Sequence, residues 1–131
     1  MGSALDLPDK AVWLLRQVGS ESLKLNFDIS HFDVLGMPTE ETVPVMAPHA
    51  VHTHVKDQRG RAPSHEFLIP GEGPFDFVAY LRQMAKAGYD GYITAEVSIM
   101  VQRRHGYDPF AAAELTYRTL AGAFREAGLS T

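Results

Sequence analysis

The stretch AVHTHVK, residues 50–56, alternates apolar and polar side chains along most of its length. Successive side chains of a β-strand point to opposite faces of the sheet. One face of this predicted strand therefore carries the two valines and Thr53, and the other carries the two histidines and Lys56. Such a strand can bury its first face under helices and leave the histidine face available for a ligand.

Two further stretches, LKLNFD at 23–28 and YITAEV at 92–97, alternate in the same way. Near its carboxyl end, each carries a potential metal ligand on its polar face: Asp28 in the first and Glu96 in the second. If the apolar faces pack on helices, Asp28, His54 and Glu96 converge at the carboxyl ends of three parallel strands. Ligands gather at this end of α/β sheets and barrels. The sequence therefore predicts part of a metal site.

Helix signals separate these strands. The long segment 57–74, between the second strand and the next helix, is predicted to be a functional loop. The order αβαβαβα requires parallel strands joined by right-handed crossovers, so the fold class is α/β. The predicted helices run from Asp6 or Pro8 to Val18, from Thr39 onward with Pro44 in or near the first turn, from Asp76 to Ala87, and from about Pro109 to Ala127.

Composition limits the classes of function. The chain has 131 residues, 45% of them hydrophobic and 21% charged, which is typical of one globular domain. Its net charge of −4 gives no electrostatic basis for binding nucleic acid or an anionic membrane. The absence of cysteine excludes disulfides and thiolate zinc sites. Residues 1–6 lack a signal-peptide pattern and no apolar run is long enough for a membrane helix, so we expect a cytoplasmic protein.

Three parallel strands do not close a barrel. A (β/α)8 barrel typically needs about 250 residues, so this chain has room for less than a whole one. The first and last strands would each leave an unpaired sheet edge, and proteins normally cover or close such edges. We therefore expect a homo-oligomer, or a complementing amino-terminal half that supplies the missing strands.

Five short motifs follow one another along the chain: FDISH at 27–31, HVKD at 54–57, PGEGPFDF at 70–77, AGYDGY at 87–92 and TAE at 94–96. Taken together, they resemble the sugar isomerase/epimerase superfamily of xylose isomerase-like TIM barrels. The resemblance covers about residues 8–127 and matches strands six to eight of the barrel with their helices. It implies that residues 1–131 form a single partial TIM-barrel domain. The family's first five strands are absent, including the one that supplies a further Glu acting as metal ligand and base.

The resemblance implies a role for each central residue. Asp28, His54 and Glu96 would be metal ligands, and Glu96 would also be one of two catalytic glutamates. His31 would be catalytic and would hydrogen-bond a substrate oxygen beside the metal. The residues alone leave alternatives open: Asp28 could simply cap a loop, and His52 could be the ligand in place of His54.

Further residues are candidates for substrate contact. Lys56 and Asp57 continue the inner face into the following loop, where ion pairs with each other or with neighbours are an equal alternative. Arg103 follows the last strand and could equally lie in a solvated turn. Glu72 is expected to position the glycine-rich turn, and the flanking glycines to meet backbone requirements. The predicted substrate-binding residues are His31, His52, Lys56, Asp57 and Arg103.

The predicted ligand set indicates the metal and the reaction. Two carboxylates and an imidazole suit Mn²⁺, Mg²⁺ or Co²⁺, with Zn²⁺ as a further candidate. Such an ion can chelate a ketose carbonyl and its neighbouring hydroxyl and stabilise the enediolate formed on proton loss. Glu96 would transfer a proton on one face of the substrate. The resemblance implies isomerisation or epimerisation of a sugar or related polyol.

Three rival interpretations remain at this point. An inosose-type dehydratase would use the same scaffold and metal. The superfamily's endonucleases at abasic DNA sites need more ligands. His65 could occupy a second-metal position, but the wider ligand set is incomplete and the acidic charge argues against DNA. The last rival is a non-catalytic half-barrel assembly module, which would show neither tight metal binding nor enzymatic activity.

Overall fold

The computed structural model describes residues 4–130. Residues 1–3, which entered the signal-peptide prediction, lie outside this range. No helix among the described residues is long and apolar enough to cross a membrane. The elements are α1 Pro8–Val18, β1 Leu25–Asp28, α2 Ile29–Asp33, α3 Thr39–Met46, the 3-10 helix η1 Ala47–His49, β2 Ala50–Val55, β3 Asp57–Arg59, β4 Glu66–Leu68, α4 Phe77–Lys86, β5 Thr94–Ala95, α5 Ile99–Gln102 and α6 Pro109–Ala127.

A three-stranded parallel sheet with the order β1-β2-β5 forms the centre of the fold. This confirms the predicted α/β class, the strand order and the parallel pairing. The strands are shorter than predicted. At the start of β1, Leu23 donates its N–H to the carbonyl of Ser20 and belongs to a turn. Beyond β5, the N–H of Glu96 still donates to the carbonyl of Val55 at 2.9 Å, so the pairing continues to the candidate site.

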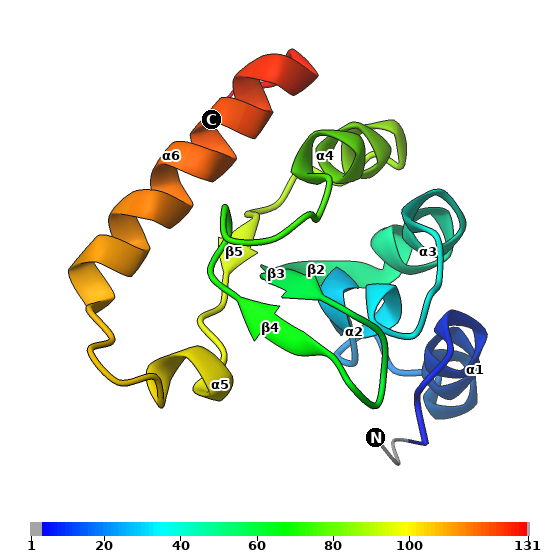
Figure 1. Ribbon diagram of the computed structural model, residues 1–131. Helices are drawn as coiled ribbons and strands as arrows, with labels where there is room; N and C mark the ends of the chain where they lie inside the picture. Colours follow the sequence, from blue (N-terminus) through cyan, green and yellow to red (C-terminus); the bar gives the residue numbers. More distant parts are fainter. Residues whose placement is uncertain (1–3, 131) are drawn as a thin grey trace.

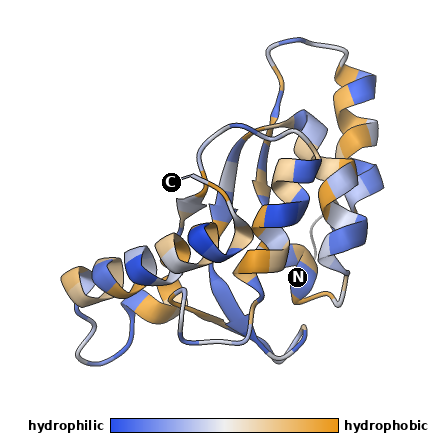
Figure 2. Cartoon of the chain, turned by 90° about the horizontal axis from the view of Figure 1, so that it is seen from above, coloured by the Kyte–Doolittle hydropathy of each residue, from blue (hydrophilic) through white to orange (hydrophobic). Residues whose placement is uncertain are grey.

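Helices α1, α3, α4 and α6 form an arc outside the sheet (Figure 1). Each carries apolar and polar faces (Figure 2), and the apolar faces bury Phe27, Val55 and Tyr80 completely. The predicted packing of helices on one face of the sheet is confirmed. Val51 is an exception, because it was predicted on the buried face but is 64% exposed. It lies at the amino end of β2, beside a hollow of about 350 Å³ that the end of α1 does not fill.

Local capping signals explain why the helix boundaries lie close to those predicted. Asp76 accepts the N–H of Ala79 at the start of α4, and Asp108 caps α6 in the same way. Gly19 and Gly128 end α1 and α6 with φ of 62° and 77°, in the left-handed region that glycine adopts easily.

Pro44 was predicted in or near the first turn of its helix, but it lies inside α3, in the second turn. Its missing N–H leaves the carbonyl of Glu40 without the usual partner. Both residues are exposed, so water can satisfy that carbonyl. The proline is tolerated on the solvent side of the helix for this reason.

The segment predicted as a loop at 57–74 contains an antiparallel hairpin of β3 and β4, in which Asp57 pairs with Leu68. Gly60 has a φ of 78° at the turn between the two strands. The hairpin places Phe67 against the rings of His31 and His65, with centroid distances of 5.4 and 4.9 Å. It therefore forms a wall beside the carboxyl ends of the parallel strands. The short helices α2 and α5 were likewise not predicted.

Candidate metal centre

Asp28, His54 and Glu96 meet at the carboxyl end of the parallel sheet. Each offers a ligand atom, and these atoms lie within 4.8 Å of one another. Asp28 pairs in register with His54, and Glu96 follows β5 directly. The predicted convergence is therefore confirmed. His52 is not in this group, and its ring packs edge-on against that of His54 with centroids 5.3 Å apart.

Asp28 uses its two carboxylate oxygens for different purposes. Oδ1 accepts the N–H of Ser30 at 3.0 Å and its hydroxyl at 2.6 Å, so Asp28 caps α2. Oδ2 faces the site, 3.3 Å from His31 Nε2. The side chain is only 10% exposed. Both interpretations of this residue, as a cap and as a candidate ligand, fit the geometry together.

Lys56 brings a positive charge into the candidate centre. Its side chain is 3% exposed, and its Nζ donates to Asp28 Oδ2 at 2.5 Å and to Glu96 Oε2. The ammonium also lies 5.2 Å from the centre of the Phe67 ring. Two of the three candidate ligands, Asp28 and Glu96, thus already hold a cation between them. Oxygen and imidazole donors arranged in this way fit a divalent ion.

His54 and Glu96 line the more open side of the centre. His54 Nδ1 lies 3.4 Å from Glu96 Oε2 and 3.4 Å from the side-chain amide nitrogen of Asn26. The side chain of His54 is 28% exposed and that of Glu96 is 43% exposed. Because exposure increases from Asp28 towards Glu96, a small molecule would approach from the side of Glu96.

His31 lies at the rim of the centre, with 46% of its side chain exposed. Its Nε2 is near Asp28, and its ring rests edge-on against Phe67. The residue is therefore held from two sides while part of the ring faces solvent. This position suits a group that orients a bound molecule without itself lying in the core.

Asp57 is buried, with 1% exposure, and its carboxylate is used by the backbone. It accepts N–H groups from Gln58, Gly71, Gly73 and Phe75 at 2.9–3.0 Å. A Cβ on Gly73 would stand 2.4 Å from Asp57 Oδ1, which explains the glycine. Asp57 was predicted to contact substrate, but in this structure its carboxylate is not available for that contact. Four N–H donors occupy it, and bulk solvent cannot reach it.

Glu72 also holds the glycine-rich turn. Its Oε2 accepts the N–H of Ile69 at 3.1 Å and the guanidinium of Arg104 at 2.7 Å. Burial acts to raise the pKa of Glu72, but these hydrogen bonds outweigh it and hold the pKa below its usual value. The expected positioning role of Glu72 is confirmed, whereas Arg103 is exposed at the end of α5 and its substrate contact stays a prediction.

Some residues around the centre were not expected from the sequence. The contact of Ser30 with Asp28 could have been predicted, because an aspartate two residues before a serine at the start of a helix is a typical capping pattern. The position of Phe67 beside the centre had no such signal in the sequence, because it depends on the hairpin of β3 and β4. The group of candidate ligands found among the described residues does not include His65, so the second-metal position is not formed there.

Two curated relatives resemble the chain in sequence. It is 31% identical over 91 residues to an uncharacterized protein of Methanocaldococcus jannaschii, an alignment that covers 68% of this chain and 30% of the relative. It is 29% identical to the rhizopine catabolism protein MocC of Rhizobium meliloti, over 98% of this chain and 43% of the relative. The chain therefore spans less than half the length of these relatives.

Solved structures share its fold. A xylose isomerase domain protein of Alicyclobacillus acidocaldarius superposes with a TM-score of 0.74 at 22% identity, over 93% of this chain and 44% of the other. D-psicose 3-epimerase, solved in the presence of D-fructose, superposes with a TM-score of 0.74 at 17% identity. The match covers 97% of this chain and 46% of the epimerase. The IolI protein with a bound zinc atom superposes with a TM-score of 0.58 at 18% identity. This match covers 92% of this chain and 40% of IolI.

The family comparison covers nearly the whole chain. The model of the xylose isomerase-like TIM barrel matches residues 2–126. That range contains all three candidate ligands and every strand of the parallel sheet. The chain belongs to the xylose isomerase-like TIM barrel family and forms part of such a barrel.

Proposed function

We propose that the chain is the carboxyl-terminal part of a divalent-metal-dependent isomerase or epimerase that acts on a sugar or related polyol through an enediolate. The convergence of Asp28, His54 and Glu96 at the carboxyl end of the sheet carries this proposal. Solved epimerases with the same fold, including D-psicose 3-epimerase, support the choice of reaction class. The ligand chemistry supports Mn²⁺, Mg²⁺ or Co²⁺, and the zinc atom in IolI keeps Zn²⁺ among the candidates.

Asp28, His54 and Glu96 would hold the metal ion. When bound, a divalent ion supplies positive charge to the oxygens of a carbonyl and a neighbouring hydroxyl, which favours loss of the proton between them. Asp28 contributes Oδ2, since Ser30 occupies Oδ1. Asn26 lies beside the His54 ring, with its side-chain amide nitrogen 3.4 Å from Nδ1, the nitrogen that also faces Glu96.

Glu96 would transfer the proton to or from the substrate. It is the most exposed of the three carboxylate and imidazole groups, so it can reach both the ion and a bound sugar. His31 would orient a substrate oxygen from the rim, because its ring is held by Phe67 while part of it faces solvent. His52, Lys56 and Arg103 remain proposed substrate contacts.

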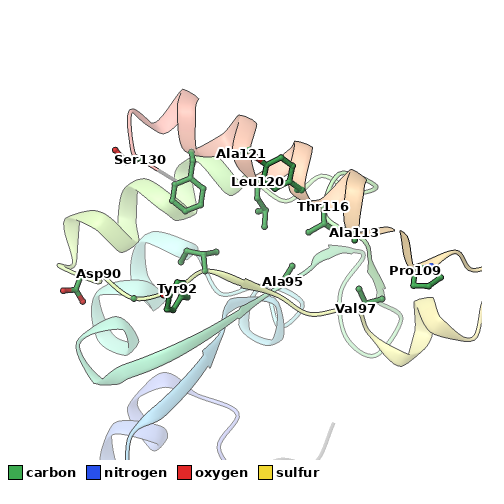
Figure 3. A pocket seen from close by; sticks show the side chains of 14 residues that line it. Asp90, Tyr92, Ala95, Val97, Pro109, Ala113, Thr116, Leu120, Ala121 and Ser130 are labelled. Atoms are coloured by element: carbon green, nitrogen blue, oxygen red, sulfur yellow. The ribbon is translucent and has the colours of Figure 1, made fainter. Parts of the chain in front are cut away.

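Turnover would need further strands, from a complementing amino-terminal part or from a second copy of the chain. Within residues 4–130, no further strand pairs with the outer edge of β1 or of β5. A cavity of about 850 Å³ lies between the β5 edge and α6 (Figure 3), lined by Ala95, Val97 and Leu120 among others. A second hollow of about 500 Å³ lies beside β1. Both are the places where neighbouring strands and helices of a barrel would pack.

A metal titration combined with a panel of sugars and polyols tests the proposal. The chain is assayed alone and together with an amino-terminal fragment carrying five strands of the family. We expect Mn²⁺ or Co²⁺ binding by the chain, negligible turnover alone, and isomerase or epimerase activity with the fragment. Glu96→Gln should abolish that activity without unfolding the chain.

Other outcomes point to other functions. Loss of water from the substrate, seen as an unsaturated product, would favour the inosose-type dehydratase. Absence of both metal binding and activity in every combination would leave the non-catalytic assembly module and overturn the proposal.

A further inference from the structure

Lys56 occupies the position where the two carboxylates of the candidate centre meet. It contacts Asp28 on one neighbouring strand and Glu96 beyond the other. The side chain of Lys56 is almost completely buried, although lysine is among the residues least often found buried. A lysine in this place requires an explanation beyond surface ion pairing.

The sequence places Lys56 there through the pleat of β2. It lies on the same face as His52 and His54, one position beyond the strand's last residue. Its long side chain runs across the end of the sheet, and the ring of Phe67 lies over the ammonium. The contact thus joins all three strands through one flexible residue.

Electrostatics explain what the ammonium does in the metal-free chain. Asp28 Oδ2 and Glu96 Oε2 both contact the same nitrogen, so the two oxygens lie close together. Two carboxylates at such separation repel each other unless a cation lies between them. A divalent ion held by Asp28, His54 and Glu96 would use the same oxygens. Lys56 and the ion therefore require the same place.

We propose that Lys56 is the resident cation of the metal-free centre and competes directly with the divalent ion for Asp28 and Glu96. It keeps the ligands assembled before the metal arrives and must release both carboxylates when the metal binds. Lys56 thereby lowers the metal affinity of the centre. This inference rests on the proposed metal-dependent function.

Isothermal titration with MnCl₂ tests the competition, using Lys56→Met and Lys56→Gln in the same chain. Both variants remove the charge, and the glutamine retains hydrogen-bond donors in case the methionine variant fails to fold. Lys24→Met is the matched control, because Lys24 is exposed at the opposite end of β1 and its loss changes the net charge equally. We expect each Lys56 variant to bind Mn²⁺ at least tenfold more tightly than the wild type, and Lys24→Met to match the wild type.

Thermal unfolding supplies a second readout. Without metal, the Lys56 variants should unfold several degrees below the wild type, and saturating Mn²⁺ should raise their midpoint more than it raises that of the wild type. A purely structural ion pair would also lower the metal-free midpoint, but it would leave Mn²⁺ affinity unchanged or weaker. That result in a folded variant overturns the competition.

A measurement on the wild-type chain is independent of folding in the variants. Reductive methylation followed by mass spectrometry should label Lys56 slowly in the metal-free chain and faster with Mn²⁺, while Lys24 is labelled equally in both. Equal labelling of Lys56 overturns the inference. If the wild type and both variants all fail to bind Mn²⁺, the proposed metal-dependent function fails as well. If the wild type binds Mn²⁺ and the variants bind equally, only the competition fails.

Discussion

Asp28 shows how one residue can serve the local fold and the candidate site together. Its Oδ1 fixes the start of α2 through Ser30, which in turn fixes the direction of Oδ2. A ligand whose second oxygen is already bonded loses less rotational freedom on binding an ion. The sequence alone left capping and ligation as alternatives, because it cannot show which oxygen meets which partner.

At this scale, we predict that His54 and His52 differ sharply in their effect on metal binding. His54→Ala should weaken Mn²⁺ binding by about 100-fold or more, since loss of a ligand should exceed the 10–100-fold cost of losing a supporting contact. His52→Ala should leave the affinity nearly unchanged, because His52 packs against the His54 ring and is not part of the candidate ligand group found among the described residues. Calorimetric titration of both variants measures this, and the reverse order would assign the ligand to His52.

Asp57 provides a test of loop structure against substrate contact. Asp57→Ala should lower the free energy of unfolding by about 2–4 kcal/mol, because several buried backbone N–H groups lose a charged acceptor. Asp90→Ala is the control, since Asp90 is exposed. Urea denaturation measures both. Unchanged stability with weakened sugar binding in the complemented enzyme would instead restore the predicted substrate contact.

The regular elements could be predicted because their signals are local. Asp76, Asp108 and the glycines at the helix ends lie within one turn of the helix that they start or stop. The hairpin of β3 and β4 escaped prediction because each strand has three residues, too few for alternation to be visible. The connection between them, residues 60–65, is also longer than the two-residue turn that marks a hairpin most clearly in a sequence.

The same limit applies to the site. Convergence of Asp28, His54 and Glu96 follows from strand phase and parallel pairing, both of which the sequence indicates. The position of Lys56 between two of them depends on the reach of a flexible side chain, and the wall formed by Phe67 depends on the hairpin. Neither has a pattern of its own in the sequence.

The contact of Glu72 with Arg104 links the glycine-rich turn to the end of α5, and its strength should depend on pH. Folding lowers the pKa of Glu72 from its usual value of 4.5, so the folded state binds fewer protons than the unfolded state. The Glu72 carboxylate therefore stabilises the folded state fully at pH values above 4.5. The gain is lost as pH falls through the folded-state pKa. We predict that Glu72→Gln costs about 0.5–1 kcal/mol at pH 7, a surface-pair magnitude.

Urea denaturation of wild type and Glu72→Gln from pH 7 down to pH 3 measures this difference. The two curves should approach each other as pH falls below 4.5, because the stability that the lowered pKa of Glu72 contributes is lost as pH falls towards the folded-state pKa. A stability difference that stays constant across the range would mean that the charge of Glu72 is not what holds the turn.

At the scale of the whole molecule, the arrangement is an open segment of a barrel. The helices bury one face of the sheet, while the other face holds the candidate centre. In the described part of the chain, the two outer strands have no further strand paired to them. Solved structures of the same fold are more than twice as long as the matched part. The exposed Glu96 and the apolar cavity beside β5 have a common cause, since both lie where further strands of a barrel would pack.

The β5 edge is the surface where we expect the chain to assemble with further strands. Tyr117 lines the cavity between β5 and α6 but is 73% exposed, so it contributes little to the fold of the chain alone. Tyr117→Arg places a charge at an apolar contact surface, where burial without a partner is costly. We expect the wild type to form a homo-oligomer or to bind an amino-terminal fragment, and the variant to lose this association while its melting temperature stays nearly constant.

Light scattering at micromolar concentration, with and without the fragment, measures the association. Trp13→Arg is the matched control, because Trp13 is an exposed aromatic residue of α1 that does not line this cavity. A wild-type chain that stays monomeric and takes up no fragment would refute assembly. Equal losses in Tyr117→Arg and Trp13→Arg would place the contact elsewhere, since a charge beside the β5 edge would then act no differently from one on α1.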